Sequence, residues 1–168
     1  MPGLQAAESG AQPRRRKIPE SVLVVIHSPD LQVLLLERAD HPGFWQSVTG
    51  SKDSPEESLL QTCRREVMEE TGLDTADYRL ADLQLTNRFE IFAHWRHRYE
   101  EGVTHNLEHV FALEVPAPLP IVLAPREHLR YQWLPWDQAA PRCFSWTNVK
   151  AIEELARRTP GGAAPRAT

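Results

Sequence analysis

The chain has 168 residues, of which 41% are hydrophobic and 25% charged, values close to those of an ordinary globular domain. Its length is sufficient for one domain with a substantial core. The net charge of −4 lacks the basic excess on which general nucleic-acid binding depends. We therefore expect a folded protein without general affinity for nucleic acids.

The cysteines and the apolar segments exclude further classes of protein. Cys63 and Cys143 form no CxxC motif and have no histidines at zinc-site spacing, so we expect two idle thiols in a reducing compartment. The longest apolar run, residues 22–26, is too short to cross a bilayer. The basic residues 14–17 superficially resemble the start of a signal peptide, but no small-residue cleavage site follows. These features predict a cytoplasmic protein that does not bind membranes.

The expected elements follow one another between two flexible tails, residues 1–16 and 159–168, which lack hydrophobic periodicity. The region between them, residues 17–158, is predicted to form a single domain. Its predicted elements are strands over 21–27 and 32–38, a short strand within 41–50, a helix over 55–71, strands across 78–115, short strands at 119–123 and 131–136, and a helix over 147–158. This order predicts an α/β fold in which a mixed β-sheet lies between helices.

The helix over 55–71 has clear signals at both ends. Ser54 suits the N-cap, Pro55 the first helical position, and Glu57 the third position of a capping box. Gly72 suits the position just after the helix.

Three glutamates lie close to the apolar face of this helix. At about 100° per residue, Glu66 and Glu70 lie beside Cys63 on the stripe that faces the core, and Glu69 lies on its shoulder. An unpaired buried carboxylate is costly, and neighbouring acids make ionisation harder. A hard divalent cation such as Mg²⁺ or Mn²⁺ would compensate the charge. The alternative is that the helix is rotated, with its acids solvated or paired to arginines.

The segment from Arg65 to Leu73, REVMEETGL, resembles the core of the Nudix box, G-x5-E-x7-R-E-U-x-E-E-x-G-U, in which U is apolar. Glu57 occupies the first glutamate position, but six residues separate it from Gly50, one more than in the family pattern. The resemblance implies the Nudix fold and hydrolysis of a diphosphate linked to another group. It further implies that Glu66, Glu69 and Glu70 hold divalent metal, that Arg65 orients Glu69, and that Glu57 braces the loop.

Stretches outside the box resemble the branch of this family that acts in bacterial folate synthesis. They run from Lys17 through the last helix and include FWQSVTGS, RFEIF, HWRHRY, REHLRYQWL and SW-TN. This resemblance implies conversion of 7,8-dihydroneopterin 3′-triphosphate to dihydroneopterin monophosphate and pyrophosphate, with Mg²⁺ or Mn²⁺ as cofactor.

The resemblance also implies roles for individual residues. Catalysis is expected from Glu66 and Glu69, and metal binding from Glu66, Glu70 and Glu127. The residues expected to contact substrate are Lys17, Arg38, Thr49, Phe89, Glu90, Ile91, Phe92 and Ser145. Lysine and arginine suit phosphate, and the phenylalanines suit a flat pterin ring.

Simpler interpretations of the same residues remain open. Lys17 can be the end of a solvated basic tail, Phe89 and Ile91 can be alternating core residues, and Ser145 can simply cap the last helix. The histidines, among them His128, have no paired spacing on one helix face and are interpreted as loop or strand residues.

Two other functions compete with the pterin hypothesis. The chain can be a Nudix hydrolase of nucleoside triphosphates or dinucleoside polyphosphates. It can also be a Nudix-fold binding module without catalysis, although the complete set of box acids argues against this.

Overall fold

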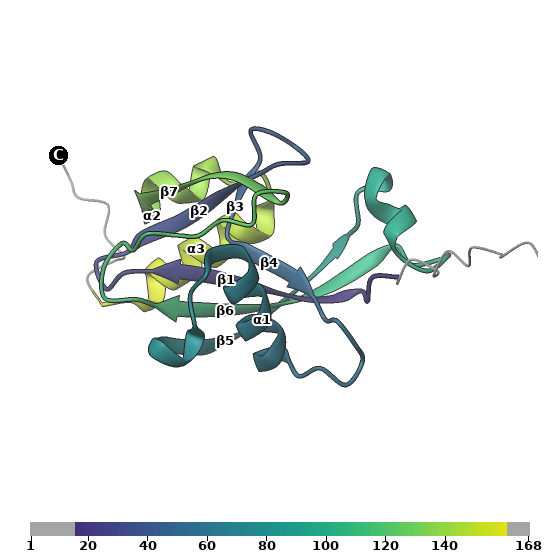
Figure 1. The fold of residues 1–168 in the computed structure, drawn as a ribbon, viewed down its shortest axis with the longest axis horizontal. Helices are drawn as coiled ribbons and strands as arrows, with labels where there is room; N and C mark the ends of the chain where they lie inside the picture. Colours follow the sequence, from purple (N-terminus) through teal and green to yellow (C-terminus); the bar gives the residue numbers. More distant parts are fainter. Residues whose placement is uncertain (1–15, 161–168) are drawn as a thin grey trace, which may run out of the picture.

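The computed structural model describes residues 16–160, so nearly all of the two expected tails lies outside the described residues. Figure 1 shows one mixed sheet with helices on both of its faces. The strands are β1 (Glu20–His27), β2 (Gln32–Arg38), β3 (Trp45–Gln46), β4 (Val48–Ser51), β5 (Arg79–Glu90), β6 (His105–Glu114) and β7 (His128–Pro135). The helices are α1 (Leu59–Thr71), α2 (Trp136–Arg142) and α3 (Trp146–Arg158), with 3-10 turns η1 (Thr75–Asp77) and η2 (Ala93–Arg98).

The sheet has seven strands in the order β3-β2-β1-β6-β5, with β4 also paired to β1 and β7 to β2. Strand β1 runs parallel to β6 and antiparallel to β4, which makes the sheet mixed. The predicted α/β fold with a mixed sheet between helices is therefore confirmed. The predicted strands over 21–27 and 32–38 correspond to β1 and β2.

Two hydrophobic clusters cover the two faces of the sheet. Successive side chains of a strand point to opposite faces, so β1 contributes Val22 to one cluster and Leu23 to the other. Cys63 and Val67 bring α1 onto the first face. Ile152 of α3 packs on the opposite face, beside α2. The polar sites considered below lie where these two clusters end.

Helix α1 begins four residues later than the sequence analysis predicts. Ser58, rather than Ser54, is the N-cap: its hydroxyl accepts from the Gln61 amide, and the Gln61 side chain accepts from the Ser58 amide. This second capping box competes successfully with the one based on Ser54 and Glu57, and Glu57 lies in the preceding loop. At the other end, Gly72 has φ +74° and caps the helix as predicted.

Further differences concern the short segments. Residues 119–123 form no strand and instead run beside α1, where the Val122 amide donates to the Thr71 carbonyl. Helix α2, which contains Pro141, follows β7 directly, in a region after residue 136 for which the sequence analysis predicts no element. At about 100° per residue, Leu60 of the predicted helix would lie on the apolar face about 60° from Cys63. It is instead 56% exposed, because it lies in the first turn of the shortened helix.

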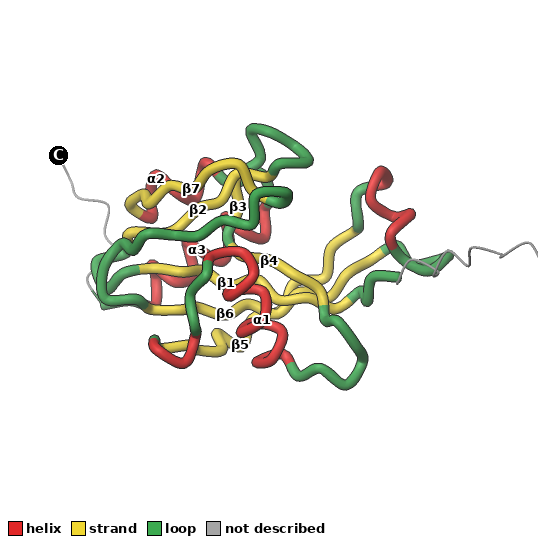
Figure 2. The backbone as a smooth tube through the Cα atoms, in the orientation of Figure 1, coloured by secondary structure: helices red, strands yellow, loops and turns green. Residues whose placement is uncertain are grey.

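The hairpin of β5 and β6 extends beyond the part of the sheet that α1 covers, and η2 lies at its far end, to the right in Figures 1 and 2. The Lys17 amide donates to the Arg98 carbonyl, which joins the start of the described chain to this extension. None of the helices within residues 16–160 is long and apolar enough to cross a membrane.

We predict that Ser58→Ala lowers the free energy of unfolding by about 1 kcal/mol, because it removes the N-cap of α1. Ser54→Ala is the matched control, and it should change the free energy of unfolding by less than about 0.5 kcal/mol. Urea unfolding of both variants measures the effect. A larger loss for Ser54→Ala than for Ser58→Ala would contradict the helix start described above.

Candidate active site

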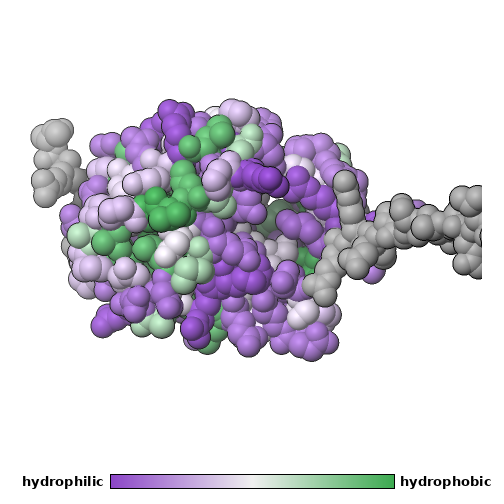
Figure 3. Space-filling view, viewed as in Figure 1, coloured by the Kyte–Doolittle hydropathy of each residue, from purple (hydrophilic) through white to green (hydrophobic). Residues whose placement is uncertain are grey.

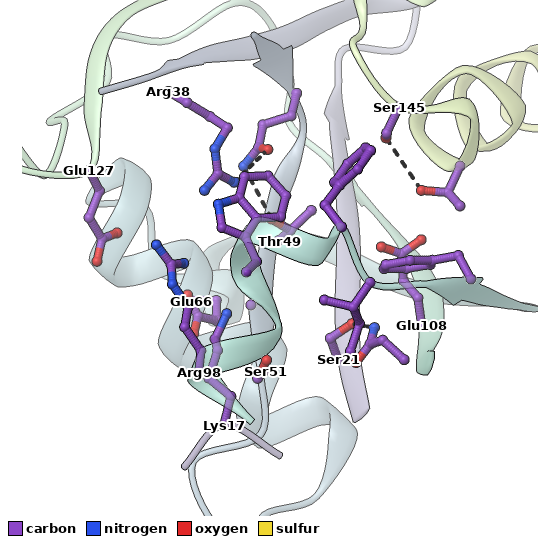
Figure 4. A pocket seen from close by; sticks show the side chains of 18 of the residues that line it. Lys17, Ser21, Arg38, Thr49, Ser51, Glu66, Arg98, Glu108, Glu127 and Ser145 are labelled. Atoms are coloured by element: carbon purple, nitrogen blue, oxygen red, sulfur yellow. Dashed lines mark hydrogen bonds between the residues drawn. The ribbon is translucent and has the colours of Figure 1, made fainter. Parts of the chain in front are cut away.

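A cavity of about 770 Å³ lies between α1, the β5–β6 extension and the first turn of α3. Figure 3 shows it as a recess between the main body and the extension. Figure 4 shows Glu66 and Glu127 on one side of it and Glu108 and Ser145 on the other. We call these sides the carboxylate end, formed by Glu66, Glu70 and Glu127, and the Glu108 end.

Gly50 allows Glu66 to reach the carboxylate end. A Cβ atom at position 50 would lie 2.0 Å from the Glu66 carboxyl carbon, so the α1 side chain passes directly over the β4 backbone. Burial raises the pKa of Glu66 to about 7, while the neighbouring Arg65 guanidinium opposes the shift. The glycine at position 50 thus has a steric role, since a side chain there would leave no room for this carboxylate.

Glu70 is almost fully enclosed by the walls of the cavity. Its side chain is 5% exposed, and its Oε2 atom has no hydrogen-bond partner within residues 16–160. Burial, followed by the charges of Glu66 and Glu127, raises its pKa well above the usual value. The predicted burial of Glu66 and Glu70 is confirmed, because both lie on the core side of α1.

The exposed Glu127 and the buried His128 approach Glu70 from the start of β7. One ligand atom from each of these three residues lies within 4.8 Å of the others. His128 Nε2 is 3.6 Å from Glu70 Oε1, and burial, with the positive charge of Arg38, lowers the pKa of His128 to about 4. The imidazole is therefore neutral, and it places a nitrogen rather than a positive charge beside the carboxylate.

Arg65 and Glu57 act together to hold the long loop before α1 in place. Two guanidinium nitrogens of Arg65 donate to Glu57, at 3.0 and 2.9 Å, and a third interaction reaches the Ser51 carbonyl at 2.9 Å. Glu57 also accepts from the Asp53 amide at 3.0 Å. These contacts lower the pKa of Glu57 to about 2, the Arg65 hydrogen bonds being the main cause. Glu57 thus closes the loop that contains the extra residue.

Arg65 also contacts the helix acids on either side of it. It donates to Glu66 Oε1 at 2.8 Å and lies 3.5 Å from Glu69 Oε2. The alternative in which arginine pairs with the helix acids therefore holds in part for Glu66. It does not hold for Glu70, whose carboxylate forms no salt bridge with lysine or arginine within residues 16–160.

Basic groups lie near the carboxylate end. Lys17 lines the cavity, and burial, followed by the charge of Arg98, lowers its pKa. Arg38 lines the cavity too, where it pairs with Asp40 at 2.7 Å and donates to Gln46 at 3.1 Å. Gln46 in turn donates to the Thr49 hydroxyl at 3.1 Å, so an ordered chain links Arg38 to Thr49.

The other residues predicted to contact substrate also line this cavity: Phe89, Glu90, Ile91, Phe92 and Ser145. These residues differ in exposure and in their polar contacts. Phe92 is half exposed, whereas Ile91 is buried, and Glu90 pairs with Arg96. Ser145 caps α3, and its hydroxyl accepts from the Asn148 side-chain amide at 2.7 Å.

The structure separates Glu69 from the other acids and adds residues that sequence reasoning missed. Glu69 is 52% exposed and is absent from the described lining of the cavity. His128 and Glu108 both line it. The position of His128 next to Glu127 was an available signal, because both follow the same turn. Glu108 gave no local signal, since it lies between Leu107 and His109 among the polar residues that begin a strand.

The carboxylate end fits a divalent cation. Glu70 presents an unpartnered buried oxygen, and Glu66 and Glu127 add two more carboxylates that raise its pKa through their negative charge. Hard oxygen donors in this arrangement are the ligands that Mg²⁺ and Mn²⁺ prefer. A cation would remove both the repulsion between the acids and the desolvation of Glu70.

Comparisons with known proteins agree with this geometry. The NUDIX domain model matches residues 17–155. The chain is 48% identical over 142 residues to the dihydroneopterin triphosphate diphosphatase of Escherichia coli K12, covering 83% of this chain and 93% of that protein. It is 41% identical to the enzyme of the same name from Haemophilus influenzae, with 80% and 85% covered.

A solved structure described as the E. coli dihydroneopterin triphosphate pyrophosphohydrolase superposes with a TM-score of 0.78 at 47% identity, covering 83% of this chain and 96% of that one. A NUDIX hydrolase structure from Listeria monocytogenes, 24% identical with a TM-score of 0.72, covers 87% of this chain and 97% of its own and shares the fold. The chain therefore belongs to the NUDIX domain family.

Proposed function

We propose that this protein is a metal-dependent pyrophosphohydrolase that converts 7,8-dihydroneopterin 3′-triphosphate to dihydroneopterin monophosphate and pyrophosphate. One observation carries the chemistry: the buried, unpartnered carboxylate of Glu70 lies beside Glu66 and Glu127 at one end of a large cavity. The identity of 48% over most of both chains supports the choice of substrate.

The carboxylate end would hold the cation, through Glu66, Glu70 and Glu127, with Mg²⁺ or Mn²⁺ as the ion. When bound, such an ion neutralises phosphate charge and lowers the pKa of water. Lys17 and Arg38 lie close enough to this end to pair with phosphate oxygens that extend beyond the carboxylates. The Arg38–Gln46–Thr49 chain keeps the guanidinium oriented before the substrate arrives.

Hydrolysis breaks the anhydride bond between the α- and β-phosphates. The oxygen of water forms a new bond to one of these two phosphorus atoms, the bridging oxygen leaves on the other, and one carboxylate accepts a proton of the water. Glu66 and Glu69 are the two candidates for this base. Glu66 is the stronger candidate, because it lines the cavity and Arg65 fixes its position.

The β5–β6 extension would bind the heterocycle. Phe89 and Phe92 supply apolar ring faces, and Glu90, Ile91 and Ser145 complete this wall of the cavity. The same proposal includes a catalytic domain formed by residues 17–158 and a role in folate synthesis in the cytoplasm. It includes neither general binding of nucleic acids nor binding of membranes.

We predict that dihydroneopterin triphosphate is cleaved with a kcat/KM at least roughly tenfold above that of dATP, ATP or diadenosine tetraphosphate, because the cavity walls select the heterocycle. The measurement is a panel of these substrates with purified protein and Mg²⁺, with separate assays for pyrophosphate and orthophosphate. Orthophosphate as the sole phosphate product would contradict the proposal. A nucleotide preference would support the second hydrolase hypothesis, and metal binding without turnover of any substrate would support the binding module.

Glu66→Gln should lower kcat/KM by about 100-fold or more, because it removes a carboxylate that lines the cavity. Glu69→Gln should lower it by less than about tenfold, since that side chain is half exposed. Glu56→Gln, which alters an exposed acid of the preceding loop, is the control and should leave turnover within about twofold. The reverse order of Glu66 and Glu69 would transfer the role of base to Glu69.

Glu70→Gln should change how stability depends on pH. The pKa of Glu70 in the folded protein lies above its usual value of 4.5, so ionisation increasingly disfavours folding as the pH rises above 4.5. In EDTA, wild type and variant should unfold alike at pH 5, and wild type should be less stable by about 1–3 kcal/mol at pH 8. Adding Mg²⁺ at pH 8 should stabilise wild type alone.

Thermal and urea unfolding at both pH values measure this difference, and Glu69→Gln provides the control on the same helix. That variant should follow the wild-type pH dependence, because its carboxylate is half exposed. Equal stabilisation of Glu70→Gln by Mg²⁺ would exclude Glu70 as a ligand.

A further inference from the structure

Glu108 is a buried acid at the end of the cavity opposite Glu66 and Glu127 (Figure 4). It lies on β6 with 4% of its surface exposed. Its direct cross-strand neighbours are Ser21 of β1 and Asn87 of β5. Nothing in the proposed phosphate chemistry uses this carboxylate, so its burial requires another explanation.

The sheet face that carries Glu108 changes character along β6. Two and four residues further on, Val110 and Ala112 point to the same face and belong to the hydrophobic cluster beneath α3. Where the first turn of α3 ends this cover, the face becomes polar and borders the cavity. The polar residues that replace the apolar ones are Ser21, Asn87, Asn106 and Glu108. A polar patch on an otherwise apolar face suits a ligand with a polar edge.

The acceptors of this patch have few donors. Glu108 receives one long hydrogen bond, 3.5 Å from Asn87 Nδ2, and forms no salt bridge within residues 16–160. Lys150, the nearest candidate cation on α3, donates to Asn87 Oδ1 instead. Burial raises the pKa of Glu108 to about 7, with partial compensation from Thr147 and Asn87.

Asn106 adds a second acceptor to the same patch. Its Nδ2 atom donates to the Ser21 hydroxyl at 2.7 Å, which fixes the orientation of the amide. Its buried Oδ1 atom has no partner in the described part of the chain. Buried acceptors of this kind are costly unless a ligand supplies the donors. The missing partner therefore carries several N–H groups and no negative charge.

A flat ring with two adjacent N–H donors meets this requirement. The 2-amino-4-oxo edge of a pterin places an exocyclic amine next to a ring N–H, and two parallel donors match the two oxygens of one carboxylate. Phe89, the cross-strand neighbour of Asn106, lines the cavity beside this patch, as do Phe144 and Trp146. Adenine offers an amine next to a ring acceptor, which a carboxylate repels.

We propose that Glu108 is the specificity-determining residue of this site and accepts hydrogen bonds from the 2-amino group and the adjacent ring N–H of a 2-amino-4-oxo pyrimidine ring. The proposal rests on the proposed function for the identity of the ring, and it assigns to one carboxylate the discrimination between a 2-amino-4-oxo ring such as pterin and a ring without this edge, such as adenine. The triphosphate of the same substrate extends toward the carboxylate end.

The first test compares kcat/KM for dihydroneopterin triphosphate in wild type and Glu108→Gln, which has the same shape without the charge. We expect a loss of roughly 10- to 100-fold, chiefly as a higher KM, because one acceptor of a bidentate pair becomes a donor. Glu114→Gln, on the same strand but outside the described lining of the cavity, should behave like wild type. A Glu108→Gln value within twofold of wild type would overturn the inference and leave the proposed function intact.

The second test needs no turnover. Pterin and lumazine differ only in an amino or oxo group at position 2 and can be titrated by their own fluorescence into metal-free protein. Wild type should bind pterin at least roughly tenfold more tightly than lumazine, and Glu108→Gln should lose this preference.

The two tests separate the hypotheses. The protein could bind pterin selectively through Glu108 and yet fail to hydrolyse dihydroneopterin triphosphate. That result would overturn the proposed function alone. Equal selectivity in wild type and Glu108→Gln, or no selectivity in wild type, would overturn the role of Glu108. Thermal unfolding checks that the variant is folded, and we expect it to be at least as stable as wild type, because it removes a buried charge.

Discussion

The burial of two carboxylates one helical turn apart is the constraint on which the rest of this structure depends. Glu66 and Glu70 lie on the core side of α1, where desolvation and mutual repulsion both oppose ionisation. Gly50 makes room for the first acid, and Arg65 compensates part of its charge. Glu70 forms no salt bridge with lysine or arginine in the described chain, and its Oε2 atom has no partner there, so the fold retains a site that suits a cation. Arg65 serves the loop as well, since its bonds to Glu57 and Ser51 close the segment before α1.

The cavity joins two different chemical environments because the sheet extends further than the helices that cover it. Beneath α3 the sheet face is apolar, and beyond its first turn the same strands present Glu108 and Asn106. One end of the cavity therefore offers carboxylates suited to a cation and phosphate, and the other offers acceptors suited to N–H groups. A substrate with a charged tail and a flat polar ring matches both ends at once. The carboxylate end suits any polyphosphate, and we propose that the Glu108 end selects the ring.

Sequence reasoning succeeded where the signal was local and periodic. The helical wheel placed Glu66 and Glu70 correctly, because helix orientation is set by residues such as Cys63 and Val67 within the same segment. It misplaced the helix start, because Ser54 and Ser58 both begin plausible capping boxes and only packing chooses between them. The 119–123 segment has strand composition but finds no strand partner in the described sheet, and its amide bonds to α1 instead.

Glu108 marks the limit of that approach and shows what tertiary structure adds. Within HNLEHVFALE it lies between Leu107 and His109, among the polar residues that begin the strand, so the sequence pattern favours exposure. Its burial arises from three elements distant in sequence, namely Ser21 on β1, Asn87 on β5 and Thr147 on α3. The acids of α1 reveal the reaction because a helix brings them together locally. The acid that we propose to select the substrate becomes recognisable only when β1, β5 and the start of α3 come together around β6. Reaction and specificity are therefore encoded at different ranges along this sequence.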